Sequence, residues 1–135
     1  MKQTPKNITK LRPNEIFVFG SNTSGEHLGG AARIAFEKFG AEWGKWEGFS
    51  GQTYAIPTID SWTWKPVSRS SLLSSIRRFL RFVHSNPEKK FYLTKIGCGI
   101  AGWDVEEVKV IFQDAIAKEA LSLHNLLVPK EFKKL

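Results

Sequence analysis

Residues 15–20, Glu-Ile-Phe-Val-Phe-Gly, form a continuous run of β-forming apolar side chains. A strand with one face in water usually alternates apolar and polar residues. A run without that alternation is typical of a strand buried on both faces, in a sheet that helices cover. This segment therefore predicts a layered α/β domain with the strand at residues 15–20 inside it.

Other segments repeat this strand character and alternate with helical patterns. Further strands are predicted at residues 53–56, where Pro57 would end the strand, at residues 91–96, and at residues 125–128. Helices are predicted to begin at Gly29-Gly30, at Ser68 or Ser70, and at Asp104, and to end at Gly40, at Asn86-Pro87 and near residue 123. Residues 41–53 form a long loop with room for a short hairpin. The order β-α-β-α-β-α-β predicts a three-layer α/β/α sandwich with a mainly parallel or mixed sheet.

The 135 residues are expected to form a single domain. Within it, residues 1–13 look like a polar approach segment with room for a short edge strand, and residues 130–135 like a basic tail. No apolar run approaches the roughly 20 residues of a membrane helix, and the N-terminus lacks the apolar segment of a signal peptide. We therefore expect a cytoplasmic protein that does not contact a membrane.

The formal net charge is +7, from 20 Lys and Arg against 13 Asp and Glu. This excess favours anionic partners such as nucleotides or nucleic acid, although it also serves solubility. A single cysteine, Cys98, allows no internal disulfide and no cysteine-based zinc cluster, and the three histidines are scattered. We therefore expect neither a metal site nor a cofactor.

Three loops are expected at the carboxyl edge of the sheet, where open α/β sheets bind ligands: residues 20–30, 57–67 and 97–103. The third loop has the spacing G-x-G-x-x-G, with Gly97, Gly99 and Gly102. Glycines let backbone N–H groups approach a phosphate, and a helix N-terminus adds unpaired donors. The motif follows the third main strand and precedes no further βαβ unit, which argues against a dinucleotide-binding Rossmann domain. A tight turn that only packs strand against helix is the alternative.

Four motifs in order resemble a known family: Ile-Phe-Val-Phe-Gly-Ser-Asn at 16–22, Gly-Gly-Ala-Ala at 29–32, Gly-Gln-Thr-Tyr-Ala-Ile-Pro at 51–57, and Ile-Gly-Cys-Gly-Ile-Ala-Gly-Trp at 96–103. The chain is similar over residues 14–129 to macro domains, and closest to the small macro-like proteins of phages and bacteria. The resemblance implies a fold that binds ADP-ribose or a related nucleotide. It also implies that Asn22 and Trp103 lie beside the distal ribose and that the two glycine-rich segments hold the diphosphate. The ligand-binding residues expected on this basis are Ser21, Asn22, Gly29, Gly30, Ala31, Ala32, Pro57, Gly97, Cys98, Gly99, Ile100, Ala101, Gly102 and Trp103.

The resemblance also raises hydrolysis of an ADP-ribosyl bond as an activity. Candidate catalytic residues are Asn22, to orient ribose or water, His27 as a general base, and Asp60 to activate water. Each has a simpler interpretation: Asn22 and Asp60 as turn residues, and His27 as part of an exposed loop pair with Glu26. Cys98 is expected to be a small buried thiol. The Gly-Gly-Ala-Ala stretch carries no acid, whereas many hydrolytic macro domains have an aspartate there.

The sequence therefore predicts a protein that binds ADP-ribose or a related nucleotide between two glycine-rich loops, with hydrolysis as an added activity. Two alternatives stay open. One is a basic nucleic-acid-binding module that uses Arg77, Arg78, Arg81 and the tail, and the other is a sensor or sponge that binds a nucleotide signal without turnover.

Overall fold

The structure is a computed structural model and describes residues 1–133 and 135. Its elements follow one another along the chain as β1 (Glu15–Asn22), α1 (Gly30–Lys38), β2 (Gly48–Ser50), β3 (Thr53–Ile59), α2 (Arg69–Ser85), β4 (Lys90–Leu93), α3 (Val105–Lys118), β5 (Leu126–Leu127) and the 3-10 helix η1 (Lys130–Phe132). The predicted alternation of strands and helices is confirmed. The hairpin allowed for in residues 41–53 is present as β2 and the start of β3.

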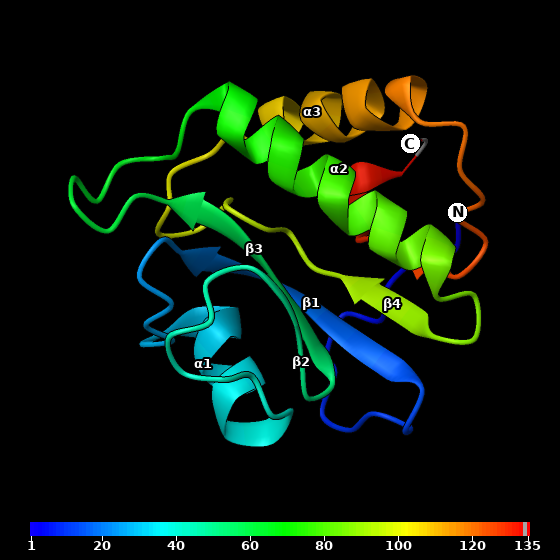
Figure 1. Ribbon diagram of the computed structural model, residues 1–135, viewed down its shortest axis with the longest axis horizontal. Helices are drawn as coiled ribbons and strands as arrows, with labels where there is room; N and C mark the ends of the chain where they lie inside the picture. The colour runs from blue at the N-terminus through cyan, green and yellow to red at the C-terminus, as the bar shows by residue number, and fades with distance from the viewer. Residues whose placement is uncertain (134) are drawn as a thin grey trace.

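The five strands form one sheet in the order β2-β3-β1-β4-β5 (Figure 1). β1 lies at the centre and runs parallel to β3 and β4, and β5 runs parallel to β4. β2 is antiparallel to β3, so the sheet is mixed. Because β1, β3 and β4 are parallel, their carboxyl ends meet at one edge, as the βαβ order predicts.

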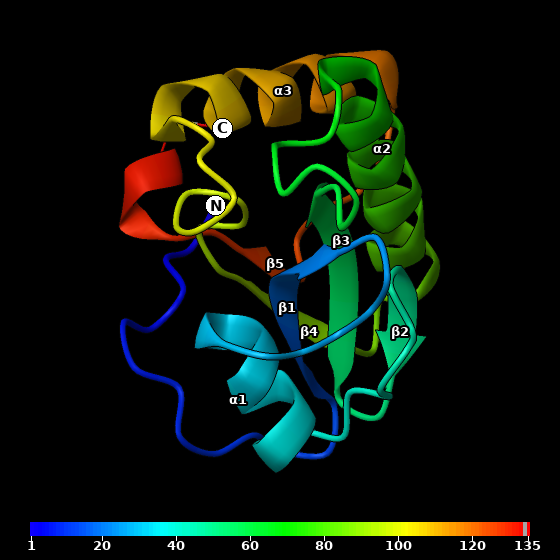
Figure 2. The ribbon, with the colours of Figure 1, turned by 90° about the vertical axis from the view of Figure 1, so that its left-hand side faces the viewer.

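Successive side chains of β1 point to opposite faces of the sheet and so belong to two separate cores. Phe17 and Phe19 pack with Ala35 of α1 on one face. Ile16 and Val18 belong to the larger core on the other face, which α2 and α3 cover. Figure 2 shows α1 on one side of the sheet and α2 and α3 on the other. The predicted three-layer α/β/α sandwich with a mixed central sheet is confirmed.

The helix boundaries follow from local capping. Ser68 precedes α2, and its hydroxyl accepts a hydrogen bond from the Ser71 amide at 3.1 Å. Asp104 and Glu107 form the predicted capping box at the start of α3. α3 ends at Lys118 rather than near residue 123. None of the described helices is long and apolar enough to cross a membrane.

Pro57 does not end β3, contrary to the sequence prediction, because β3 continues to Ile59. β2 pairs with β3 only as far as Ala55, so Pro57 lies where β3 has no neighbour on that side. The backbone carbonyl of Gln52 faces β1, where it accepts from the Phe17 amide. With a period of two, the nitrogen of Pro57 faces the opposite, free edge, where a missing N–H costs no ladder hydrogen bond.

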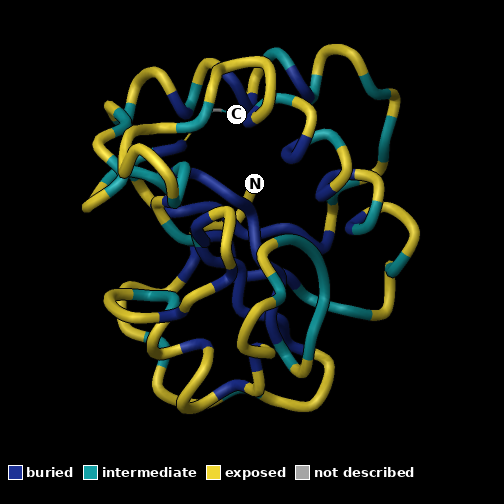
Figure 3. Tube along the Cα trace, turned by 60° about the vertical axis from the view of Figure 1, so that its left-hand side comes forward, coloured by how far each residue is buried: buried dark blue, intermediate teal, exposed yellow. Residues whose placement is uncertain are grey.

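The two ends of the chain are more closely integrated than the sequence predicts. Gln3 forms a parallel bridge with Val128, which gives the expected edge pairing. The segment expected to be a basic tail contains η1, and Phe132 within it is fully buried, 5.7 Å from Phe112 between ring centroids. Figure 3 shows buried positions through the sheet and exposed ones along the connecting loops.

Candidate ligand-binding cleft

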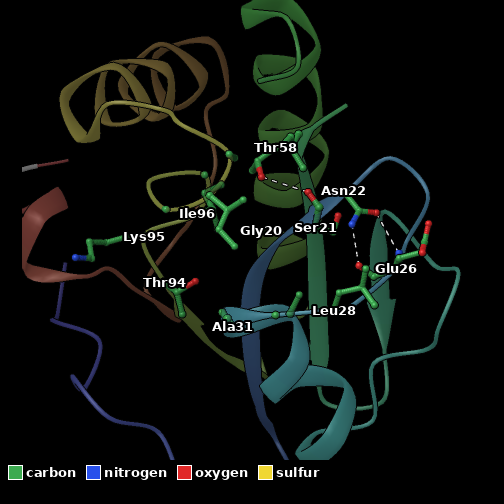
Figure 4. Close-up of a pocket in the computed structure, with 18 of the residues that line it drawn as sticks. Gly20, Ser21, Asn22, Glu26, Leu28, Ala31, Thr58, Thr94, Lys95 and Ile96 are labelled. Carbon is green, nitrogen blue, oxygen red and sulfur yellow. Dashed lines mark hydrogen bonds between the residues drawn. The ribbon is translucent and has the colours of Figure 1, made fainter. Parts of the chain in front are cut away.

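A cavity of about 340 Å³ opens at the carboxyl ends of β1, β3 and β4, between the N-terminus of α1 and the loop after β4 (Figure 4). This first cavity has the size of a small-molecule site. It is lined by Gly20, Ser21, Asn22, Glu26, Leu28, Gly29, Gly30, Ala31, Ala32, Thr58, Ile59, Trp64, Thr94, Lys95, Ile96, Gly97, Gly99, Ile100 and Ala101. The two glycine-rich segments singled out in the sequence therefore face each other across one cavity.

The N-terminus of α1 forms one wall of the first cavity and has no side-chain cap. Gly29 at the N-cap position supplies no capping side chain, and the first turn contains no acidic residue. Gly30 has φ +59°, and a Cβ atom at either glycine would meet nothing within 4 Å. The first amides of a helix lack intrahelical partners and carry a partial positive charge. This wall therefore offers open backbone donors to an anion.

Residues 97–102, the glycine loop, form the opposite wall. Two hydrogen bonds close the turn, from the Gly102 amide to Gly99 O (3.0 Å) and from the Trp103 amide to Gly97 O (2.8 Å). The amides of Gly99, Ile100 and Ala101 donate to no acceptor among the described residues. A second set of backbone donors thus lines the same cavity.

Trp103, which the resemblance places beside the distal ribose, does not line the first cavity, and neither do Cys98 and Gly102. The Trp103 indole N–H donates to the backbone carbonyl of Thr58 at 3.0 Å, so this side chain anchors the glycine loop to β3. Gly97 has φ +74°, and a Cβ there would lie 2.7 Å from Trp103 Cδ1. Trp103 therefore anchors the glycine loop to β3 without lining the first cavity.

Cys98 is half-buried, and its thiol lies 3.4 Å from the carbonyl oxygen of Ile96. Burial raises the pKa of the Cys98 thiol, and this outweighs the nearby Lys95 ammonium. A raised pKa leaves little thiolate at neutral pH, and the thiolate is the nucleophilic form. These features agree with the interpretation of Cys98 as an inert packing residue.

Asn22 lines the cavity, but its side chain organises the loop that follows β1. Its Oδ1 accepts from the amides of Ser24 (3.2 Å) and Glu26 (3.1 Å) and from the Ser24 hydroxyl (3.0 Å). Its Nδ2 donates to Glu26 O at 2.8 Å (Figure 4). The amide oxygen is thus committed to the turn, which is the alternative that the sequence left open.

His27 and Asp60, the other catalytic candidates, lie outside the first cavity. His27 is 2% exposed, and its Nε2–H donates to Glu42 O at 2.8 Å. It packs against aromatic rings, among them Phe19 and Trp43, so the expected exposed loop pair is wrong for this residue. The Asp60 carboxylate accepts from the Trp62 amide at 2.7 Å, as a turn aspartate does. Pro57 also lies outside the first cavity, in β3.

Charged side chains contribute little to the first cavity. Glu26 and Lys95 are the charged residues in its lining. Lys95 Nζ lies 3.3 Å from the Glu131 carboxylate, and in Figure 4 its side chain points away from Asn22. Sequence reasoning missed Lys95, although its place between β4 and the glycine loop was a usable signal. Phosphate charge in this cavity would therefore be met mainly by backbone N–H groups.

The mouth of the first cavity is apolar. Leu28 is 58% exposed and Ile100 is 88% exposed, although both are large hydrophobic residues. Trp64 also lines the cavity and has φ +55°, a strained conformation for a residue with a side chain. Exposed apolar side chains that surround a polar cradle are typical of ligand sites.

Three arginines of α2, Arg77, Arg78 and Arg81, are the ones that the nucleic-acid alternative would use, and each has a carboxylate partner. Arg77 and Arg81 both donate to Glu119, each at 2.9 Å. Arg78 pairs with Glu47 through two hydrogen bonds. The three guanidinium groups are thus bound to carboxylates of the same chain.

A scan of protein-family models and a search of curated proteins find no match to this chain. Among solved structures, the chain is similar to a protein of unknown function from Bacteroides thetaiotaomicron. The two are 13% identical, the similarity covers 90% of each chain, and the TM-score is 0.63. At this identity the likeness supports the α/β/α fold alone.

Proposed function

We propose that the protein binds ADP-ribose or a related nucleotide diphosphate in the first cavity. The observation that carries this proposal is the meeting of two sets of backbone donors across that cavity. One set is the uncapped N-terminus of α1, and the other comprises the amides of Gly99, Ile100 and Ala101. Opposed backbone donors suit a diphosphate, which carries negative charge on both phosphate groups.

The apolar mouth supports a nucleotide over inorganic phosphate. Leu28, Trp64 and Ile100 offer apolar surface beside the anion cradle, and a planar base buries its faces well on such surface. The resemblance of residues 14–129 to macro domains agrees with this proposal and suggests ADP-ribose as the first ligand to test.

Binding has more support than hydrolysis. The oxygen of the Asn22 amide is already bonded within its own loop, and neither His27 nor Asp60 lines the first cavity. Glu26 is the one carboxylate in the lining, and its Oε1 lies 3.0 Å from the Ser24 hydroxyl oxygen. We therefore place a non-catalytic nucleotide sensor or sponge ahead of an ADP-ribosyl hydrolase.

The nucleic-acid alternative has less support from the described side chains. Arg77, Arg78 and Arg81 each have a carboxylate partner, which reduces the positive charge available to a nucleic-acid phosphate backbone. This alternative predicts binding that weakens steeply with salt, and ADP-ribose would compete poorly.

The substitution Gly99→Glu tests the site by calorimetric titration with ADP-ribose, with AMP and NAD as comparisons. A Cβ at Gly99 meets nothing within 4 Å, so the variant should fold. Two like charges about 4 Å apart repel by about 4 kcal/mol at an effective dielectric constant of about 20, which is roughly a thousandfold loss of affinity.

Gln113→Glu is the matched control, because it adds the same charge on the exposed face of α3, away from the cavity. It should bind ADP-ribose like the unmodified protein. If Gly99→Glu also bound ADP-ribose with unchanged affinity, the assignment of this cavity would be wrong.

A further inference from the structure

A second cavity, of about 630 Å³, lies beside the first and shares no lining residue with it. The loops after β1 and β3 meet between the two cavities. There the Ser24 amide donates to Ser61 Oγ at 3.0 Å, and the Ser61 amide donates to Thr23 Oγ1 at 2.9 Å. Asn22 lines the first cavity, whereas its neighbour Thr23 lines the second. The second cavity is thus a separate compartment at the same edge of the sheet.

The charges in the second cavity differ from those needed for a phosphate. Its charged lining residues are Arg78, Glu47 and Asp60, which give one positive and two negative formal charges. Arg78 is already bound to Glu47, with Nε–Oε2 2.5 Å and Nη2–Oε1 2.9 Å. Asp60 forms no ion pair with a described basic residue, and Ser68 already caps the nearby N-terminus of α2. An anion would therefore meet net repulsion, whereas an uncharged ligand would not.

The rest of the lining is rich in hydroxyl groups, and the hydroxyl of Ser75 is buried and fully bonded. Ser75 is 3% exposed, donates to Glu47 Oε1 at 3.1 Å and accepts from Arg78 Nη2 at 3.1 Å. The lining also contains four serines around the start of α2, and Trp46, which is 49% exposed. Hydroxyls both donate and accept, and the guanidinium and carboxylates add fixed donors and acceptors.

We propose that the second cavity binds an uncharged polyhydroxyl sugar. The mixture of donors and acceptors in this lining matches sugar hydroxyls, and we expect the half-exposed Trp46 to pack its indole against the C–H face of a pyranose ring. This site is independent of the nucleotide site, because it uses other residues and a different ligand chemistry.

The test is an NMR titration of the ¹⁵N-labelled protein with D-glucose, D-ribose and glucose 6-phosphate. The indole N–H of Trp46 and the guanidinium Nε–H of Arg78 are the reporters. Glucose or ribose should shift both resonances saturably, and glucose 6-phosphate should bind more weakly than glucose because of the two carboxylates. The absence of a saturable shift with either neutral sugar would overturn the proposal, as would equal or tighter binding of glucose 6-phosphate.

Trp46→Ala, followed through Arg78, should lower the sugar affinity by about fivefold or more, as truncation of a central aromatic contact does. Trp43→Ala is the matched control, because Trp43 is 51% exposed and lines neither cavity. Ser74→Phe gives a second variant, since it would fill the cavity from an exposed position on α2. If both cavity variants kept the affinity of the Trp43→Ala control, the sugar would not bind here.

Discussion

Two glycines of the glycine loop should respond in opposite ways to the same substitution by alanine. Gly97 has φ +74°, and an added Cβ would lie 2.7 Å from Trp103 Cδ1 and 3.3 Å from Thr58 Cβ. Gly99 does not have a positive φ, and its added Cβ would meet nothing within 4 Å. A comparison of Gly97→Ala with Gly99→Ala therefore separates two effects on stability. One comes from backbone conformation and close packing, and the other from the alanine methyl group itself.

The expected magnitudes follow from three contributions. A non-glycine residue in the left-handed region costs about 1–2 kcal/mol. Overpacking against Trp103 costs about 1–3 kcal/mol. The lower entropy of the unfolded chain offsets about 0.4–1 kcal/mol of this. Gly97→Ala should thus lower the free energy of unfolding by about 2–4 kcal/mol, whereas Gly99→Ala should leave it unchanged or raise it by up to about 1 kcal/mol.

Urea unfolding followed by tryptophan fluorescence measures both free energies by linear extrapolation. Equal m-values would show that the unfolded states are comparable. If the two variants lost the same stability, the close contact of Gly97 with Trp103 would be wrong. If Gly99→Ala were the less stable of the two, the open space at Gly99 would be wrong.

Two further substitutions test the core. Tyr92→Phe removes the hydrogen bond from the tyrosine hydroxyl to Glu15 Oε2 (2.5 Å) and should cost about 1.5–3 kcal/mol at pH 7, measured by urea unfolding. Burial raises the pKa of Glu15, but hydrogen bonds from the Arg12 amide and Tyr92 outweigh it and hold this pKa below the usual value. The free energy of unfolding therefore decreases as the pH falls through the pKa that Glu15 has in the folded protein. In Tyr92→Phe this decrease between pH 7 and acid should be smaller. An unchanged pH dependence in the variant would contradict this role of Tyr92. Phe132→Ala should lower the free energy of unfolding by about 3–5 kcal/mol, because Phe132 is fully buried beside Phe112; a loss below about 1 kcal/mol would mean that η1 is not part of the core.

The layered fold was predictable because its signals are local. The apolar run at residues 15–20 indicates a strand buried on both faces, and capping residues such as Ser68 and Asp104 mark helix starts. Pro57 and Phe132 were misjudged because their roles depend on tertiary context. Pro57 is tolerated only because its nitrogen faces the free edge of β3, and the Phe132 side chain is buried only because η1 packs under α3.

The position of the candidate cleft was predictable for the same reason, but the roles of its side chains were not. Glycine spacing reports on the conformation of its own loop, and both glycine-rich segments singled out in the sequence line the first cavity. The partners of the Asn22 amide are local, and this turn role was one of the two interpretations that the sequence left open. The partner of the Trp103 indole depends instead on which groups the folded chain brings near. The Asn22 amide bonds to its own loop, and the Trp103 indole bonds to β3.

This difference bears on what the cleft can recognise. If side chains held the ligand, its recognition would depend on residues such as Asn22. The amide oxygen of Asn22 already accepts hydrogen bonds from its own loop. In this cavity the open donors are backbone amides, and Lys95 is paired with Glu131. Backbone donors recognise the charge and spacing of phosphates but do not distinguish one base from another. We therefore expect affinity for the first cavity to depend more on the diphosphate than on the base, so that ADP-ribose should bind well above AMP.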